Sequence, residues 1–572
     1  MLRSPVVWGA GLSIVLGCLS SVVLPPAFIG TIPSVLNYTL PDNSASKQLD
    51  SFVELSITTR IILALMVLTI LQMIKGVYQR NYDRGQFGLD VMEVPQVKLR
   101  WPFNADLIPF DINIMRTGYC GATWEVLVAL YGNIFNLRLF EQDLILTVEP
   151  EVVKAVLSTE FNNYEKGPDI KGMMFSVLGD GVFNSDGETW KAHRSMSRPY
   201  FTRDRMSHFD NFARHADVAI SKLLARMAEP NHPAVDFQDL ACRFTLDSGT
   251  EFLFGRDVHS LDASLPYPHE EPRDDGASFG AAFARAQQHI THRLGLPVLW
   301  PWMELFWDRT LEDMKIIHAY VKPILVRQGS KPMKQNETVI RDEIINILVA
   351  ARDTTAASLT FAVYMLSQNP EIMARLREEI IDRLGTSSIP TPQDLKEMKY
   401  MRAFLNETLR LFPPVPANSR AAKKSTVLKV KDKNYFVPSG TRIIWSTLLM
   451  HRRKDLWGPD ADEFDPNRWL DDRFKKYVMS NPFIFLPFSA GPRICLGQQF
   501  AYSEASFFLC RLLQRVESVE LAPDSQPKET LPPSEWQNGT GRQVYEKIWP
   551  KYHLTLYCNG GLWLRMKEVE HA

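Results

Sequence analysis

The most useful absences in this 572-residue chain concern its cysteines and its charge. Six cysteines form no Cys-x-x-Cys pair and follow no regular spacing, which argues against a disulfide framework and against a zinc site. Lys plus Arg number 64 and Asp plus Glu 65, so nothing points to nucleic acid as a partner. There is no glycine-rich nucleotide loop, no fused flavin or nicotinamide segment and no internal repeat. A reduced catalytic part that faces the cytosol is expected.

One cysteine lies in a segment that suits a haem iron ligand, Phe488-Ser-Ala-Gly-Pro-Arg-Ile-Cys-Leu-Gly497. Cys495 supplies a thiolate, whose electron donation to iron favours cleavage of an O–O bond. Gly491 and Gly497 let the backbone pass close to a flat macrocycle. Arg493 offers donors to a propionate, and Phe488 can shield the sulfur from water. A lone Cys between apolar residues is usually a small buried hydrophobe, but these five residue types at this spacing favour a ligand.

This segment resembles the cysteine loop of the cytochrome P-450 superfamily, the haem-thiolate monooxygenases. Four further stretches match that family in its own order. They are Trp190-Lys-Ala-His-Arg194, Ala350-Ala-Arg-Asp-Thr-Thr355, Glu407-Thr-Leu-Arg410 and Phe464-Asp-Pro-Asn-Arg468-Trp469. The resemblance implies a mainly α fold with small β-sheets, the cytochrome P-450 fold, over residues 86–572. It also implies haem b (iron protoporphyrin IX), with Cys495 as the axial ligand of the iron.

Residues that hold the cofactor follow from the same resemblance. Trp190 and Arg194 lie four apart on a predicted helix, point the same way, and would bind a propionate with Arg493 as second partner. Arg420 is a weaker third candidate, because Arg after prolines is more often exposed to solvent. His193 has no assigned role.

A buried ionic network beneath the haem is also implied, formed by Glu407, Arg410 and Arg468. The alternative is a surface ion pair, which would contribute under about 1 kcal/mol.

The central helix carries the implied catalytic residues. The family assigns proton delivery to Asp353, connected to solvent, and to Thr354, beside the oxygen. A hydroxyl in mid-helix can also bond back to the preceding turn and bend the helix. A solvated helix face is the alternative. Two departures concern activity more than fold: Ala351 stands where the family usually has Gly, and residues 326–339 form a shorter stretch than in relatives.

Periodicity predicts the main elements. Alternation around 141–143 predicts a hairpin of residues 131–140 and 144–148. Helical spacing predicts helices at 150–158, 202–227, 339–366, 370–384 and 398–411. Asn559-Gly-Gly561 predicts a last hairpin of residues 553–558 and 562–566.

The N-terminal region, residues 1–85, reads as a membrane anchor and linker. Residues 6–24 carry no charge and would span about 28 Å as a helix, close to the bilayer core. A cleaved signal peptide is the alternative. A second candidate span covers about 61–78, and this segment could cross the bilayer or lie at its surface. If both cross, basic residues after the second place the catalytic domain in the cytosol and Asn37, in a glycosylation pattern, in the lumen of the endoplasmic reticulum.

The expected activity is that of a membrane-bound monooxygenase that hydroxylates an apolar substrate (long-chain alkane, fatty acid or xenobiotic). The motifs look most like those of fungal n-alkane and fatty-acid hydroxylases. Electrons would come from NADPH-cytochrome P-450 reductase. Alternatives are a haem-thiolate isomerase, dehydratase or peroxygenase, or an inactive haem-binding variant. Candidate docking charges are Lys423, Lys424, Arg452, Arg453 and Lys454, and candidate channel residues are Phe175, Val182, Phe183, Val349, Ala350 and Leu562.

Overall fold

The computed structural model describes residues 57–88, 90–140, 142–201, 209–270, 279–297, 299–328 and 337–570. The chain divides into a small unit, residues 1–91 and 298–307, and a large unit, residues 92–297 and 308–572. The small unit contributes helices α4 (Ile57–Gly85) and α13 (Trp300–Met303).

The second predicted membrane span is not seen as one. Among the described residues, no helix is both long enough and apolar enough to cross a bilayer. The span expected at 61–78 is helical and lies inside α4. Its uncharged run, from 61 to 74, is about 21 Å of helix against a bilayer core of about 30 Å. The span at 6–24 and Asn37 lie outside the described residues.

The large unit is mainly helical, as expected. Its longer helices are α5 (Leu107–Thr117), α6 (Ala122–Tyr131), α8 (Pro168–Leu178), α9 (Gly187–Ser197), α10 (Asp210–Met227), α11 (Phe237–Phe254), α12 (Phe279–Gly295), α14 (Leu311–Gln328), α15 (Glu337–Gln368), α16 (Pro370–Leu384), α18 (Lys399–Leu411) and α21 (Gln498–Arg515). The shorter ones are α7 (Pro150–Lys154), α17 (Pro392–Glu397), α19 (Thr447–Met450) and α20 (Lys454–Trp457).

These helices confirm the predictions from periodicity. The helix expected at 150–158 is α7 continued by a π-helical turn, Ala155–Thr159. The other four are α10, α15, α16 and α18, with residues 202–208 outside the described part.

Four small sheets complete the large unit. The largest has the strand order β2 (Ile134–Asn136), β3 (Leu144–Thr147), β9 (Arg442–Ser446), β6 (Ala417–Ala422) and β4 (Tyr164–Glu165). The others are β1 (Val91–Glu93) with β8 (Lys433–Val437) and β7 (Thr426–Val430); β10 (Val516–Leu521) with β13 (Trp563–Glu568) and β5 (Val235–Asp236); and β11 (Pro550–Tyr552) with β12 (Leu556–Cys558). The antiparallel pair β2–β3 confirms the first predicted hairpin.

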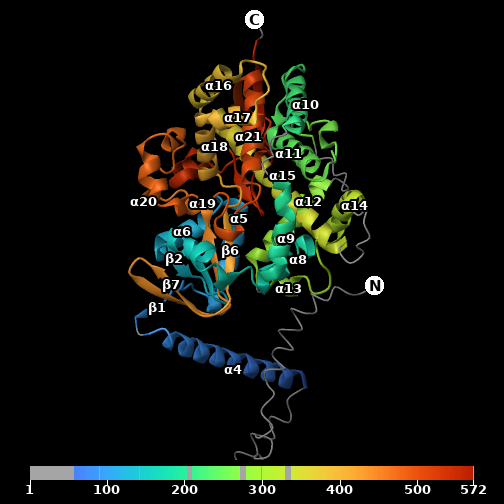
Figure 1. The fold of residues 1–572 in the computed structure, drawn as a ribbon. Helices are drawn as coiled ribbons and strands as arrows, with labels where there is room; N and C mark the ends of the chain where they lie inside the picture. Colours follow the sequence, from blue (N-terminus) through green and yellow to red (C-terminus); the bar gives the residue numbers. More distant parts are fainter. Residues whose placement is uncertain are drawn as a thin grey trace, which may run out of the picture. The chain divides into compact units, whose positions relative to one another are not determined.

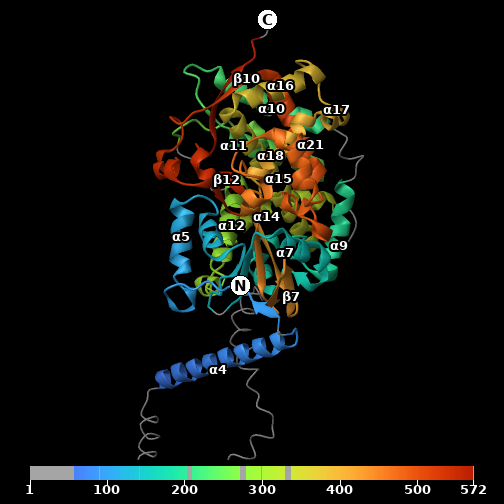
Figure 2. The ribbon, with the colours of Figure 1, turned by 90° about the vertical axis from the view of Figure 1, so that its left-hand side faces the viewer.

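Helix α15 runs through the middle of the large unit, with α11, α18 and α21 beside it in both views (Figure 1, Figure 2). It is buried on all sides from about residue 342 to 366, which is typical of a core helix. Apolar residues of α15 such as Leu359 and Phe361 pack in one cluster with Phe404 of α18 and Phe508 of α21. Any polar side chain on this helix must therefore find partners inside the protein.

The predicted last hairpin is wrong. Strand β12 pairs with β11, whereas β13 pairs with β10 and β5, so the Asn-Gly-Gly turn joins two different sheets. Gly560 and Gly561 both have positive φ, 76° and 88°. A Cβ on Gly561 would lie 2.3 Å from the carboxylate of Asp236. The glycines thus let the chain pass close to Asp236, whose side chain caps the N-terminus of α11.

We predict that Gly561→Ala destabilises the protein more than Gly440→Ala does. Both positions have positive φ, so both variants carry backbone strain of about 1–2 kcal/mol. Only at Gly561 does the added methyl also clash, because the space at Gly440 is open. The clash should add about 1–3 kcal/mol to the loss in free energy of unfolding, measured by denaturant titration. Equal losses in the two variants would contradict the close approach of the chain to the carboxylate of Asp236 at Gly561.

Candidate active site

The cysteine loop lies directly before α21. The carbonyl of Phe488 accepts a hydrogen bond from the backbone N–H of Cys495 at 3.0 Å. Of the cysteines in the described residues, Cys495 is exposed, Cys242 is partly buried and the others are buried. Protein atoms around the sulfur raise the pKa of Cys495 by desolvation, while the N–H of Gly497 and the charge of Arg194 act to lower it. Cys495 is thus the cysteine available to an external ligand.

The two loop glycines do different things. Gly491 has φ +67°, and a Cβ there would lie 1.8 Å from the carbonyl oxygen of Leu157. The absence of a side chain at Gly491 therefore makes room for the backbone of Leu157. The sequence had predicted that this space lies next to a macrocycle. At Gly497 a Cβ would lie 3.9 Å from the sulfur of Cys495, an ordinary contact distance.

A group of buried cations with few counter-charges lies beside this loop. Lys166 follows β4 and interacts electrostatically with Arg420, Arg493 and Arg442. Lys166 and Arg420 are 9% and 4% exposed. Burial and the neighbouring cations hold the pKa of Lys166 well below its usual value and lower that of Arg420 to about 9. Among the described residues, no carboxylate lies within ion-pair distance of Lys166, Arg420 or Arg442.

A nearby carboxylate, Asp186, pairs with Arg493 at 2.7 Å. Arg493 also donates to the carbonyl of Ser185 and stacks over Trp190 at 4.5 Å. Arg194 donates to the carbonyl of Ile494, one residue before the cysteine, at 2.7 Å. The structure therefore brings Trp190, Arg194 and Arg493 together beside Cys495, with Arg493 already held by a carboxylate.

These residues fit haem. A buried, uncompensated cation is unfavourable unless an anion joins it, and two propionate carboxylates would supply that charge next to a thiolate ligand. Lys166 was missed by sequence reasoning, since one lysine after a short strand carries no distinguishing signal. Arg420, the weaker third candidate from the sequence, is buried, because its strand β6 lies inside the five-stranded sheet between β9 and β4.

Glu407, Arg410 and Arg468 form a fully buried ionic network. Their exposed fractions are 0%, 0% and 1%. Glu407 accepts two hydrogen bonds from Arg410, both at 2.8 Å, and Arg468 approaches it at 3.4 Å. Trp469 and the backbone of Asp465 also donate to Glu407. Burial alone would raise the pKa of Glu407, but the two arginines outweigh it and the pKa is lowered.

The structure separates the expected docking charges into two groups. Arg452 is buried and donates to the carbonyl of Leu411 and to the hydroxyl of Tyr119. Arg453 pairs with Glu149 and Asp455. These two arginines hold the fold together and cannot serve as docking charges. The exposed members are Lys423, Lys424 and Lys454.

Asp353 and Thr354 have partners inside the protein. The hydroxyl of Thr354 donates to the carbonyl of Ala350 at 2.6 Å, as expected for a hydroxyl in mid-helix. Asp353 is 7% exposed and accepts hydrogen bonds from Gln287 of α12 at 2.5 Å and Arg352 at 3.1 Å. Direct connection of Asp353 to solvent was expected, but α12 covers it.

The departure at Ala351 is accommodated by its neighbours. Ala351 faces Gly249 of α11, where an added Cβ would lie 3.5 Å from the methyl of Ala351. Small residues thus meet where α11 and α15 pack. Helix α15 is continuous over 32 residues, although the stretch before it, 329–336, lies outside the described part.

A further buried acid, Glu504 of α21, escaped sequence reasoning. It accepts a hydrogen bond from Ser248 at 2.8 Å and bonds with Thr355, and burial raises its pKa to about 8.

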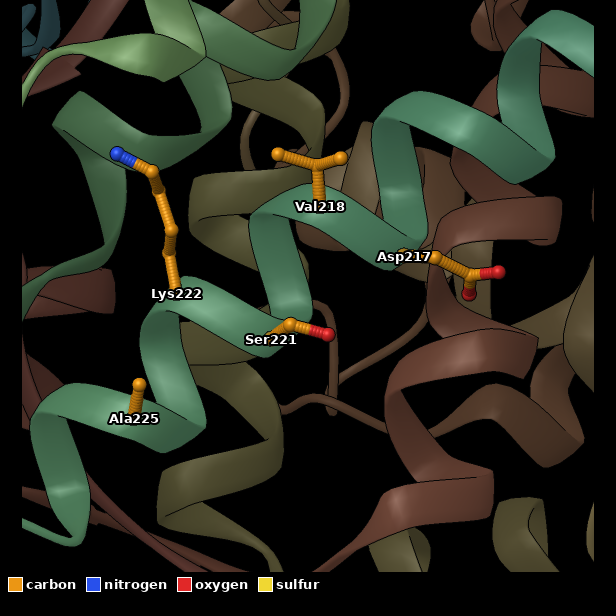
Figure 3. Close-up of a pocket in the computed structure, with 5 residues that line it drawn as sticks. All are labelled: Asp217, Val218, Ser221, Lys222 and Ala225. Atoms are coloured by element: carbon orange, nitrogen blue, oxygen red, sulfur yellow. The ribbon is translucent and has the colours of Figure 1, made fainter.

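Two cavities of the described part of the chain are lined by residues outside the cysteine loop. A shallow depression on α10 is lined by Asp217, Val218, Ser221, Lys222 and Ala225 (Figure 3). Asp217 and Lys222 point in opposite directions there, and their charged ends bond elsewhere, to Arg511 and to backbone carbonyls. A second cavity of about 120 Å³ is lined mainly by apolar residues, among them Met196, Leu253 and Ile344. Leu562, expected in a substrate channel, is fully buried in the main core.

Known proteins share this sequence pattern. The sequence model described as Cytochrome P450 matches residues 122–335 and 308–543. The chain belongs to the cytochrome P450 family. Cytochrome P450 52A10 of Candida maltosa is 37% identical over 425 residues, 68% of this chain and 79% of the relative. Cytochrome P450 52A3-A of the same yeast is 34% identical over 497 residues, 80% and 89% of the two chains.

One of the relatives is named as a monooxygenase. Cytochrome P450 monooxygenase himC of Aspergillus japonicus is 34% identical over 458 residues, 74% of this chain and 78% of the relative. This P450 is accordingly a haem-iron oxidoreductase that incorporates oxygen, and the resemblance inferred from its motifs is confirmed.

We predict that Lys166→Met weakens haem binding to this P450 and stabilises the haem-free protein. Losing a charge-assisted hydrogen bond to a propionate, about 1.5–3 kcal/mol, should lower haem affinity roughly tenfold to a hundredfold. Without haem, removing a buried uncompensated charge should raise the free energy of unfolding. Haem titration and thermal unfolding measure the two effects. Lys191→Met, at a side chain 63% exposed, is the control and should change neither. Unaltered haem affinity in Lys166→Met would remove Lys166 from the site.

We predict that Glu407→Gln lowers the free energy of unfolding by about 3–5 kcal/mol, because it leaves buried arginines uncompensated. The lowered pKa of Glu407 means that its stabilisation is present above the unfolded pKa of about 4.3 and fades as pH falls through the folded pKa. The variant should therefore differ most from wild type near neutral pH. Glu397→Gln, which removes a surface pair with Arg383, should cost under about 1 kcal/mol. Similar losses in both variants would rule out the buried network as a stabilising element.

Proposed function

We propose that the protein is a membrane-bound monooxygenase that hydroxylates a long-chain apolar substrate, an alkane or fatty acid, with haem b as cofactor. The observation that carries the proposal is the exposed Cys495 beside buried cations that lack counter-charges. The proposed roles are Cys495 as iron ligand, and Trp190, Arg194, Arg493, Lys166 and Arg420 around the propionates. Bound haem supplies the activation of dioxygen and the oxidation of the C–H bond.

The protein supplies protons and positions the groups around them. Asp353 and Thr354 are adjacent on the buried helix α15, and each makes a hydrogen bond that fixes its side chain. We assign them proton delivery to the reacting oxygen. An isomerase or dehydratase would not need this pair, so its presence favours the monooxygenase over those alternatives. The packing of Ala351 against Gly249 removes one reason to regard the chain as an inactive variant.

The membrane, the electron donor and the location are parts of the same proposal. Helix α4 exposes large apolar side chains, among them Met66, Leu71 and Ile74, which suits a helix that lies at a membrane surface. We place the enzyme at the endoplasmic reticulum membrane with the large unit in the cytosol. NADPH-cytochrome P-450 reductase is the proposed donor, with the exposed Lys423, Lys424 and Lys454 as candidate contacts for its acidic residues.

The first test concerns Cys495 as the proposed ligand of the haem iron. Cys495→Ala should abolish the thiolate-type absorption band of the reduced carbon monoxide complex, because no thiolate would then face the iron. Cys242→Ala is the matched control, at a partly buried cysteine outside the loop, and should keep the band. A band that survives in Cys495→Ala would contradict the assignment. Titration of the wild type with dodecanoic acid and hexadecane should shift the haem spin state if the substrate class is correct.

The proton role is tested at Thr354. Thr354→Ala should leave haem spectra intact, lower product formation about tenfold or more, and divert electrons from NADPH to hydrogen peroxide. Thr360→Ala is the control, because Thr360 makes the same bond to the helix, to the carbonyl of Ala356 at 2.7 Å. Product and peroxide per NADPH measure the effect. If Thr354→Ala partitions electrons as Thr360→Ala does, the assignment is wrong.

A further inference from the structure

Three polar atoms near Asp353 are buried and have no hydrogen-bond partner within the described part of the chain. They are Oε1 of Gln287, Nε of Arg352 and Nδ1 of His553. The opposite ends of the first two side chains bind Asp353, since Nε2 of Gln287 and Nη1 of Arg352 both donate to its carboxylate. Gln287 and Arg352 therefore each bind Asp353 with one polar group and direct a second polar group away from it.

His553 comes from a distant part of the sequence. It lies in the turn between β11 and β12, and β12 packs against α15. Its neighbour Leu554 packs in an apolar cluster with Phe283 of α12 and Leu348 of α15. The turn therefore lies beside the two helices that carry Gln287 and Asp353. The ring of His553 stacks on Tyr557 at 4.7 Å, which fixes its orientation.

Orphaned polar atoms of this kind are costly unless something bridges them. A buried donor or acceptor without a partner costs about 1–3 kcal/mol. Two orphaned nitrogens and one orphaned amide oxygen offer both donors and acceptors, and such a set suits water, which typically makes about three hydrogen bonds when buried. Burial lowers the pKa of His553, so at neutral pH its ring is uncharged and can accept a proton on one nitrogen while donating from the other.

We propose that Gln287, Arg352 and His553 hold a water-bridged proton path that reloads Asp353 from the side of the β11–β12 turn. The path rests on the proposed role of Asp353 in proton delivery. A proton enters at His553, passes along bridging water to the carboxylate of Asp353, and leaves toward Thr354. Each group that gives up a proton regains one from its neighbour, so no electron moves and the net charge of the path is restored. Gln287 and Arg352 are positioning residues, because they orient the carboxylate and the bridging water without passing protons to substrate.

The test uses the full-length holoenzyme with its reductase and dodecanoic acid. Gln287→Met keeps the side-chain volume and removes both polar ends. Gln288→Met is its matched control, on the next and exposed residue of α12. His553→Phe removes the ring nitrogens while keeping an aromatic ring to stack on Tyr557, and His553→Gln restores polar atoms. His292→Phe, at an exposed histidine of α12, is the matched control.

We expect Gln287→Met and His553→Phe to lower product per NADPH about threefold to tenfold, raise peroxide correspondingly and enlarge the kinetic solvent isotope effect. His553→Gln keeps a hydrogen-bonding side chain but has no titratable nitrogen, so it should stay impaired like His553→Phe, and both controls should match wild type. A readout independent of turnover is infrared difference spectroscopy, which should show the carboxyl band of Asp353, identified by its loss in Asp353→Asn, shifted in Gln287→Met.

The outcomes separate this path from the proposed function. If Asp353→Asn diverts electrons to peroxide but Gln287→Met and His553→Phe behave as their controls do, the path is wrong and the role of Asp353 stands. If Asp353→Asn itself leaves the partition unchanged, both are wrong. Loss of product with an unchanged isotope effect, wild-type product yield in His553→Gln and an unshifted carboxyl band would reduce Gln287 and His553 to structural residues and overturn the proposal.

Discussion

The constraint on which the site depends is a surplus of buried positive charge. Lys166 lies far in the sequence from the strands that carry Arg420 and Arg442, yet all three side chains are buried and Lys166 interacts with both arginines and with Arg493. Among the described residues none of the three has a carboxylate within ion-pair distance, and Asp186 is paired with Arg493. Burial lowers the pKa of each of the three. A fold that keeps these cations inside needs an anion there, and a dianionic cofactor held by Cys495 meets the need. The five-stranded sheet that carries Arg420 and Arg442 is thereby part of the cofactor site.

At several other places buried charge is paired within the protein. Glu407 is shared between Arg410 and Arg468, and Glu546 accepts from Arg542 and Tyr364. Helix α9 is fixed to α15 in the same way, because His193 approaches Glu343 at 2.9 Å. This pair ties the helix that carries Trp190 and Arg194 to the helix that carries Asp353. The cations Lys166, Arg420 and Arg442 differ from these pairs, and our proposal is that a bound cofactor compensates them.

The sequence predicted most of the features that depend on residues close together in the chain, namely helices and local motifs. Spacing within one helix located α15, α16 and α18. Local motifs selected Cys495, Trp190 and Arg194, which lie close together, and the Glu407 network, whose members are in contact. The failures involve contacts between distant segments. Nothing near Lys166 shows that Arg420 and Arg493 surround it, and the burial of Arg452 depends on Tyr119, more than three hundred residues earlier. The Asn-Gly-Gly turn has hairpin composition, but its conformation is set by Asp236 on another strand. At Gly491 the sequence predicted that the backbone passes close to a macrocycle, whereas in the structure it passes close to the backbone of Leu157.

The most direct test of this account is to compare the affinity of the haem-free protein for haem and for haem dimethyl ester, in which both propionates are neutral. The account predicts that the ester binds at least about a hundredfold more weakly, because it cannot compensate Lys166 and its neighbouring arginines. The ester should also fail to give the rise in thermal stability that haem gives. Equal affinity and equal stabilisation by the two compounds would contradict the claim that uncompensated buried charge is what the cofactor completes.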